Sequence, residues 1–199
     1  MVDVRIWLAP VEGVNVRRWM ARTLLSEATG RPPTELILER RCDRCGRPHP
    51  ANPLAGDSGE VWWSASSSDG IASVALASCR IGIDLEKDGR QVRWERIAAR
   101  FYTEGEQRAL EGSPARFLEF WTMKEAFLKA LGVGLAGGLR SLDCTTLSEA
   151  THGWRTSPMQ PGWHFAHVSP SPGFTAAVAV EGAPDSIELR SWDPDTEGR

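Results

Sequence analysis

The chain has 199 residues, a formal net charge of −3 and 41% hydrophobic residues, the composition of an ordinary globular protein that can bury a sizeable core. This charge gives no general attraction to nucleic acid or to an anionic membrane, and no apolar run is long enough to cross a bilayer. The N-terminal residues lack the basic start and the apolar core of a secretion signal, so we expect a cytoplasmic protein.

The first half of the chain predicts several strands and one helix. Apolar residues recur at helical spacing from Asn15 to Thr29, and Gly30 ends this run. The stretch 41–59 is rich in proline and glycine, which predicts turns. The segment "SSDG" between two apolar segments predicts a hairpin. The expected strands in this half are residues 3–10, 34–40, 61–66, 71–78 and 81–86.

The second half predicts helices followed by strands. Pro114 and Gly132 are the boundary signals of a helix over residues 114–131. Because helices and strands are grouped rather than strictly alternating, we expect an α+β fold with antiparallel strands. Residues 71–86 and 174–191 have similar patterns, which suggests two related lobes. The other expected helices are residues 93–102 and 103–110, and the expected strands are residues 139–147, 162–169, 173–181 and 186–192.

Cysteines are few, and two of them form a C-x-x-C pair. Cys42 and Cys45, with His49 four residues later, could be half of a zinc site, because thiolates at this spacing bind tetrahedral zinc. No second C-x-x-C and no H-x-x-x-H completes such a site. A turn tightened by glycine and proline is therefore the favoured interpretation, with zinc as the alternative. In a reducing cytosol we expect no structural disulfide.

The strand "IGIDLE", residues 81–86, carries two acidic residues at alternate positions. Asp84 and Glu86 are two positions apart, so both carboxylates project from the same face of a strand. Two like charges this close repel each other, which indicates that they bind something positive.

The helix over residues 114–131 carries an acid and an amine one turn apart, Glu125 and Lys129. An exposed pair that stabilises the helix and a functional pair fit this spacing equally well. Together with Glu125, the acids Asp84 and Glu86 would supply three hard oxygen ligands, which suit magnesium or manganese. Lys129 could then reach a phosphate, so the pattern predicts a magnesium-dependent phosphoryl-type transfer.

These segments resemble the Sfp-type 4′-phosphopantetheinyl transferases, whose motifs occur in the same order. The family pattern begins with G-[IV]-D-x-E and ends with W-x-x-K-E-A-x-x-K-x-x-G-x-G, with F-x-x-x-E between them. The matching residues of this chain are Gly82, Asp84, Glu86, Glu106, Trp121, Lys124, Glu125, Ala126, Lys129, Gly132 and Gly134.

The resemblance implies a pseudo-dimer of two similar α+β lobes with antiparallel sheets and an active site in the cleft between them. We expect residues 1–87 to form the N-terminal lobe on the coenzyme A side, residues 88–192 to form the lobe with the catalytic helix, and residues 193–199 to form a frayed tail. The implied reaction moves the 4′-phosphopantetheine of coenzyme A to a serine of an apo acyl or peptidyl carrier protein and releases adenosine 3′,5′-bisphosphate. We expect a monomer that serves polyketide, nonribosomal-peptide or fatty-acid assembly, with neither nucleic acid nor membrane as a partner.

The resemblance also implies the roles of the site residues. Asp84, Glu86 and Glu125 would hold Mg²⁺, or Mn²⁺, against the pyrophosphate of coenzyme A. Glu125 would also act as general base, and Lys129 would neutralise charge on the departing phosphate. The expected coenzyme-binding residues are Arg22, Arg47, Ser66, Ser67 and Lys129.

One departure from the family pattern lies next to the hairpin. Ser67 stands where the family usually has a histidine. A charge-assisted contact is worth roughly 1.5–3 kcal/mol, so we expect weaker coenzyme binding. Because the basic segment before the first helix is also short, a second hypothesis is a degenerate paralogue that binds carrier protein or coenzyme A without turnover.

Overall fold

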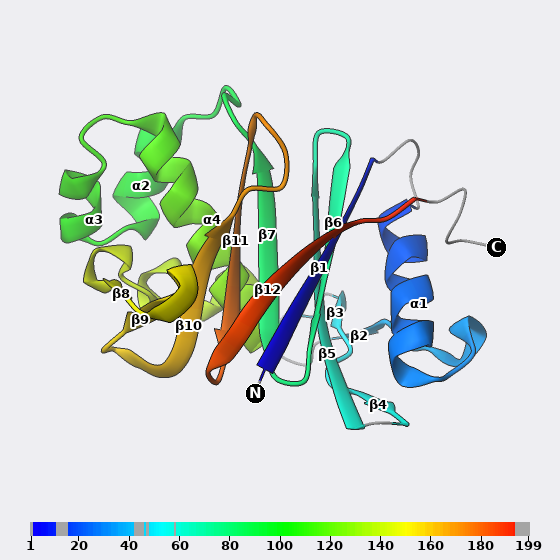
Figure 1. The fold of residues 1–199 in the computed structure, drawn as a ribbon. Coiled ribbons are helices and arrows are strands. Elements are labelled where there is room, and N and C mark those ends of the chain that lie inside the picture. The colour runs from blue at the N-terminus through cyan, green and yellow to red at the C-terminus, as the bar shows by residue number, and fades with distance from the viewer. Residues whose placement is uncertain (1, 11–15, 42–45, 47, 58, 194–199) are drawn as a thin grey trace.

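The computed structural model of the chain describes residues 2–10, 16–41, 46, 48–57 and 59–193. Two five-stranded sheets form the centre of the molecule, and helices flank them on both sides (Figure 1). None of the helices in the described part of the chain combines the length and the apolar character needed to span a membrane.

The first sheet has the strand order β12-β1-β6-β5-β4. Its strands pair antiparallel except at one edge, where β12 runs parallel to β1. The bounds are β1 (Val2–Pro10), β4 (Leu54–Gly56), β5 (Gly59–Ser68), β6 (Ile71–Ala77) and β12 (Pro184–Ser191).

The second sheet has the strand order β7-β11-β10-β9-β8, and all of its pairs are antiparallel. A separate two-stranded sheet joins β2 (Glu39–Arg41) to β3 (Pro48–Pro50). The bounds in the second sheet are β7 (Ile81–Lys87), β8 (Ser148–Glu149), β9 (Arg155–Ser157), β10 (Gln160–Val168) and β11 (Phe174–Glu181).

Four α-helices of the described residues flank the two sheets. The helices α1 and α4 have the bounds that capping signals and apolar spacing predict, within one residue. Ser113 accepts a hydrogen bond from the backbone of Arg116 at the start of α4, and Gly132 ends it with a φ of 68°. The bounds are α1 (Val16–Thr29), α2 (Trp94–Phe101), α3 (Glu104–Ala109) and α4 (Pro114–Leu131), and short 3₁₀ turns cover Pro33–Glu35, Gly134–Gly137, Leu139–Ser141, Cys144–Thr146 and Thr151–Gly153.

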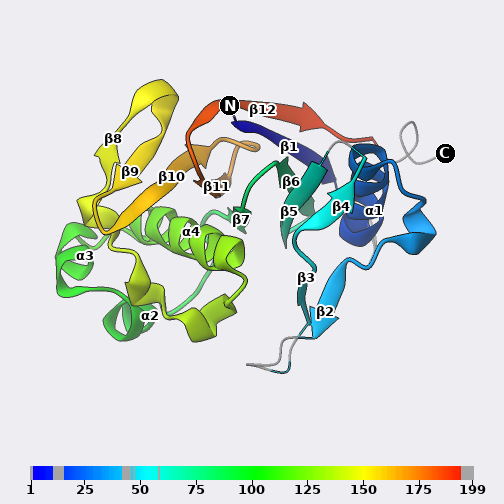
Figure 2. The same cartoon turned by 90° about the horizontal axis from the view of Figure 1, so that it is seen from below.

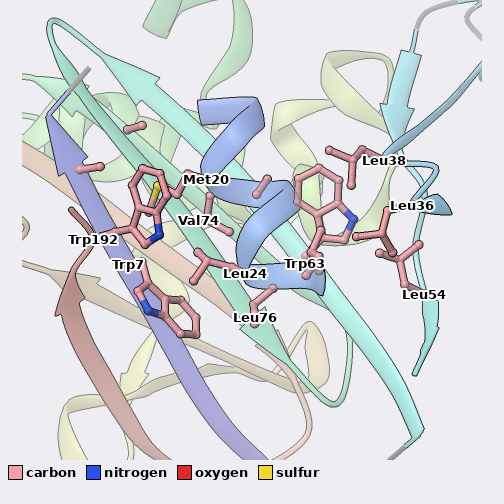
Figure 3. Packing of buried hydrophobic residues seen from close by; sticks show 14 of the residues in the cluster. Trp7, Met20, Leu24, Leu36, Leu38, Leu54, Trp63, Val74, Leu76 and Trp192 are labelled. Atoms are coloured by element: carbon pink, nitrogen blue, oxygen red, sulfur yellow. The ribbon is translucent and has the colours of Figure 1, made fainter. Parts of the chain in front are cut away.

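The layers follow from the alternation of apolar residues. One apolar cluster joins α1 to the first sheet and contains Trp7, Met20, Trp63 and Trp192 (Figure 3). A second cluster joins the two sheets, and a third packs Phe127 of α4 against β10 and β11. The order of layers is therefore α1, first sheet, second sheet, α4, and Figure 2 shows α1 and α4 on opposite sides of the strands.

The α+β class with antiparallel sheets is confirmed, whereas the expected lobes 1–87 and 88–192 stay predictions. Strand β7 pairs with β11 in the second sheet, and β12 returns to the first sheet beside β1. The order β1-β6-β5 corresponds to β7-β11-β10, with α1 and α4 at equivalent places in the chain. The pseudo-dimer stays a prediction that this correspondence supports. Of the expected tail 193–199, only Asp193 lies within the described residues.

The strand expected over residues 139–147 is wrong, because 3₁₀ turns occupy Leu139–Ser141 and Cys144–Thr146. Side chains satisfy the backbone there: Lys124 donates to the carbonyls of Leu139 and Leu142, and Glu106 accepts from the Cys144 amide. Because side chains bind these backbone groups, the segment does not need hydrogen bonds to a neighbouring strand. Of the strand expected over residues 34–40, only the last two residues lie in a strand, which is β2.

Candidate active site

Close packing of β7 on α4 brings the two acidic segments together. Gly82 faces α4 so closely that a Cβ atom there would lie 1.9 Å from the Ala126 carbonyl oxygen. Glycine is therefore the residue that permits this approach. Asp84 and Glu86 follow Gly82 in the same strand phase, so they project toward the helix that carries Glu125.

Asp84 is 4% exposed and its two carboxylate oxygens have different surroundings. Oδ1 accepts hydrogen bonds from Lys129 Nζ at 2.6 Å and from Ser66 Oγ at 3.0 Å. Oδ2 is buried without a hydrogen-bond partner among the described residues. Burial raises the pKa of Asp84 although Lys129 and Ser66 act in the opposite direction.

Glu125 is the second acid of the site, and it is half-buried. Its Oε1 also lacks a hydrogen-bond partner within the described part of the chain. Burial raises the pKa of Glu125 to about 7, with a further increase from the charges of Asp84 and Glu86 and a decrease from Lys129. The expected trio of acids and Lys129 therefore share one electrostatic environment.

Glu86 differs from the other two acids because a cation already pairs with it. Arg90 Nη1 donates to Glu86 Oε2 at 2.7 Å, and Ser68 Oγ donates to the same oxygen at 3.0 Å. The side chain of Glu86 is 20% exposed. Binding of a metal ion to this oxygen would compete with Arg90.

A metal ion fits two of the three acids directly. Among the residues that the structure describes, no group of three or more His, Cys, Asp or Glu side chains is arranged so that it could hold a metal ion. However, Asp84 Oδ2 and Glu125 Oε1 are buried oxygens that have no hydrogen-bond partner among the residues described. A buried carboxylate oxygen is costly without a donor or a cation. Magnesium commonly takes only one or two protein carboxylates and completes its shell with water and substrate phosphates. The donor set of Asp84 and Glu125 suits such an ion.

A cavity of about 350 Å³ opens beside Lys129. Arg17 and Arg18 at the start of α1 line it together with Lys129 of α4, so three cations from opposite sides of the molecule face one space. Trp63 and Pro50 add apolar surface. Glu39 also lines the cavity, so the three cations exceed the acidic charge by two. A space with this net positive charge suits an anionic ligand that also has an apolar part.

The structure separates the expected coenzyme residues. Ser67 is exposed and accepts a hydrogen bond from Arg17 Nη1 at 3.4 Å, whereas Ser66 is buried between Asp84 and Lys129. Arg22 does not line the cavity, because its guanidinium donates to the carbonyls of Pro33 and Leu36 and holds that loop. Arg47 lies outside the described residues.

The second half of the chain contains a buried ion pair, and the sequence analysis did not predict this pairing. Lys124 Nζ lies 2.7 Å from Glu106 Oε1, and both side chains are fully buried. Glu106 also caps α3 by accepting from the Thr103 amide at 2.9 Å. The pair therefore joins α3 to α4, one residue before Glu125. Its signal in the sequence is a lysine inside the apolar stripe of a helix.

The segment with the expected C-x-x-C pair approaches the end of α4. His49 Nδ1 lies 2.7 Å from the Gly132 carbonyl oxygen, and a Cβ atom on Gly134 would contact the same imidazole at 3.5 Å. Cys42 and Cys45 lie outside the described residues, so both the turn and the zinc hypothesis stay predictions. Cys79 and Cys144 are free thiols.

Comparison with known proteins agrees with the motifs at this site. The family model described as "4′-phosphopantetheinyl transferase superfamily" matches residues 80–179, which contain β7, α2–α4, β10 and most of β11. The chain is 32% identical over 139 residues to the 4′-phosphopantetheinyl transferase HetI of Nostoc sp., covering 65% of this chain and 57% of that protein. It is 28% identical over 151 residues to a phosphopantetheinyl transferase of Thraustochytrium sp., covering 67% of this chain and 50% of that protein. The chain thus spans about half the length of the curated relatives it matches.

Proposed function

Because the chain belongs to the 4′-phosphopantetheinyl transferase superfamily, we propose that it transfers the 4′-phosphopantetheine of coenzyme A to a serine hydroxyl of an apo carrier protein. The serine oxygen forms a bond to the phosphorus next to pantetheine, and the bond from that phosphorus to the bridging oxygen breaks. Adenosine 3′,5′-bisphosphate leaves. The observation that carries the proposal is the convergence of Asp84, Glu125 and Lys129 beside a cationic cavity.

The cavity supports coenzyme A as the donor. Its polyanionic nucleotide end needs cations, and Arg17, Arg18 and Lys129 provide them. Lys129 is the residue of the three that also contacts Asp84, so it would lie nearest to the reacting phosphate. There its charge would stabilise the negative charge that develops on the leaving group.

Magnesium would be held by Asp84 and Glu125, whose unpartnered oxygens are described above, and when bound it would neutralise the pyrophosphate. Glu86 is the third expected ligand, and it would have to exchange its contact with Arg90 for one with the ion. Manganese has similar ligand preferences and could replace magnesium.

Glu125 is the residue suited to take the proton of the incoming serine. In the metal-free protein, a pKa of about 7 means that the carboxylate and the acid of Glu125 are both populated near neutral pH. A general base with a pKa near the working pH is efficient because it both exists in the basic form and accepts a proton readily.

The test is a transfer assay. Wild-type protein incubated with coenzyme A, Mg²⁺ and an apo carrier protein should add one phosphopantetheine to the carrier, as measured by intact-protein mass spectrometry. Asp84→Ala and Glu125→Ala should each lower the rate by roughly 10²-fold or more, because each removes a ligand or the base. Glu188→Ala, an exposed acid on β12, is the matched control and should keep wild-type activity.

Two outcomes would count against the proposal. Normal turnover by Asp84→Ala and Glu125→Ala would contradict the site. Binding of coenzyme A or carrier protein without any transfer would instead support the degenerate paralogue.

A further inference from the structure

Three serines of β5 line the side of β7 that lacks a strand neighbour in its sheet. Ser64, Ser66 and Ser68 are alternate residues of β5, so their side chains project in one direction. Strand β7 is at the edge of its sheet, with β11 on its other side. Ser64 Oγ accepts from the Ile83 amide at 3.1 Å, and Ser68 Oγ accepts from the Lys87 amide at 3.1 Å. Side-chain hydroxyls therefore join the two sheets at the site.

The middle serine makes a different set of contacts. Ser66 Oγ donates to Asp84 Oδ1 at 3.0 Å and accepts from Lys129 Nζ at 2.9 Å, while Lys129 Nζ itself lies 2.6 Å from the same Asp84 oxygen. The Ser66 hydroxyl, the Lys129 ammonium and the Asp84 carboxylate thus form a triangle of hydrogen bonds. Each of the three groups contacts the other two.

We propose that Ser66 is a positioning residue: its hydroxyl holds Lys129 and Asp84 Oδ1 together and thereby leaves Asp84 Oδ2 free to bind a cation. This inference rests on the proposed function, since the cation is the one expected between Asp84 and Glu125. It assigns Ser66 a role different from the coenzyme contact that the sequence suggests.

The capacity of a hydroxyl supports this assignment. A serine has one proton to donate, and that of Ser66 goes to Asp84. Because Ser66 is only 5% exposed, its hydroxyl cannot serve a coenzyme phosphate unless it first releases Asp84. Ser67, the next residue, points to the other face of the strand and contacts Arg17 there.

Without the Ser66 hydroxyl, the Asp84 carboxylate loses a hydrogen bond that fixes its orientation. Lys129 has three protons and could engage both oxygens of Asp84 if the carboxylate rotated. Asp84 Oδ2 would then be occupied by the ammonium rather than presented to a cation. Loss of a group that orients a metal ligand typically lowers metal affinity 10–100-fold.

The experiment measures binding of Mn²⁺ alone to the full chain, by electron paramagnetic resonance of the free ion. Ser66→Ala should raise the dissociation constant at least tenfold over wild type. Ser64→Ala is the matched control, because its hydroxyl serves the Ile83 amide instead of an acid, and its Mn²⁺ affinity should stay within about threefold of wild type. Equal affinity of Ser66→Ala and wild type would overturn the inference.

A second pair of variants separates the hydroxyl from packing. Ser66→Thr and Ser66→Val have the same shape and differ in the hydroxyl, so any strain from the larger side chain is common to both. The Thr variant should bind Mn²⁺ at least tenfold more tightly than the Val variant, and equal affinities would refute the positioning role even if Ser66→Ala did not fold.

The same data distinguish this inference from the proposed function. If Mn²⁺ binds wild type and all Ser66 variants alike, Ser66 has no positioning role while the metal site and the transferase proposal stand. If wild type binds no Mn²⁺ with or without coenzyme A, the metal assignment itself is refuted and the role of Ser66 falls with it.

Discussion

Asp84 is buried and Glu125 is half-buried in the same site, and a cation contacts the Asp84 side chain directly. Lys129 Nζ lies 2.6 Å from Asp84 Oδ1, which compensates part of the cost of burying that charge. For Glu125, burial and the neighbouring acids outweigh the attraction of Lys129, and its pKa rises to about 7. Ionisation of Glu125 therefore lowers the free energy of unfolding of the metal-free protein. Such unfavourable buried charges are common at functional positions.

This cost makes the stability of the metal-free protein depend on pH. The pKa of Glu125 is about 7 in the folded protein, against an ordinary value of 4.5 for an exposed glutamate. Between these values the folded protein keeps a proton that the unfolded chain has released, so the free energy of unfolding falls as pH rises from about 4.5 to about 7. With a discount for partial exposure, the loss at pH 8 is on the order of 2 kcal/mol.

Glu125→Gln should therefore stabilise the fold at high pH while it weakens metal binding. In urea unfolding with chelator present, we expect a gain of about 2 kcal/mol at pH 8 and little change at pH 5. Glu119→Gln, an exposed acid on the same helix, should change little at either pH. An equal gain for Glu125→Gln at both pH values would show that charge burial is not the cause.

At the scale of elements, the site depends on how closely β7 lies on α4. The phase that brings Asp84 toward α4 also brings Gly82 there, where a side chain would strike the Ala126 carbonyl. The buried pair of Lys124 and Glu106 fixes the other side of α4, since it joins that helix to α3 and to the turns after residue 138. Removing one partner of such a pair commonly costs 3–5 kcal/mol, because it leaves the other charge buried alone.

Gly82→Ala should separate β7 from α4. The methyl group would lie 1.9 Å from backbone oxygen, so we expect a loss of about 3 kcal/mol or more in urea unfolding, together with weaker Mn²⁺ binding. Gly105→Ala in α3 is the matched control, because its new Cβ has nothing nearer than 3.6 Å. That control should be neutral or stabilising by up to about 1 kcal/mol. A mild Gly82→Ala phenotype would mean that the elements can shift apart without harm.

At the scale of the whole molecule, the cavity gathers cations from both ends of the layered structure. Arg17 and Arg18 belong to α1, which covers the first sheet, and Lys129 belongs to α4, which covers the second (Figure 2). A ligand that binds all three would connect the two halves. Such a ligand stabilises the folded state in proportion to the logarithm of its concentration.

Coenzyme A should accordingly raise the thermal midpoint of unfolding. At 100 times its dissociation constant the gain is about 2.7 kcal/mol, which corresponds to about 5–10 °C for a chain of this size. The double variant Arg17→Ala with Arg18→Ala should lose most of this shift, as measured by differential scanning fluorimetry. Arg96→Ala with Arg108→Ala removes two exposed arginines of α2 and α3 and should keep it. An undiminished shift in the first double variant would place the coenzyme elsewhere.

Features that depend on neighbours along the chain can be predicted from the order of the residues. Capping residues and apolar spacing gave α4 its bounds from Pro114 to Leu131. Strand alternation placed Asp84 and Glu86 on one face, and their spacing relative to Glu125 and Lys129 identified the family motifs. These properties follow from local geometry, which is the same wherever the segment sits in a fold.

Contacts between residues far apart in the chain depend instead on how the layers pack. Ser66 and Lys129 are 63 residues apart and Lys124 and Leu142 are 18 apart, and no periodicity encodes such contacts. The return of β12 to β1, the capture of Arg22 by a loop and the pairing of Arg90 with Glu86 are of the same kind. Each contact depends on burial that exists only once the layers are packed. A polar group that packing removes from water needs a hydrogen-bond partner from the protein, and packing determines which partner is near.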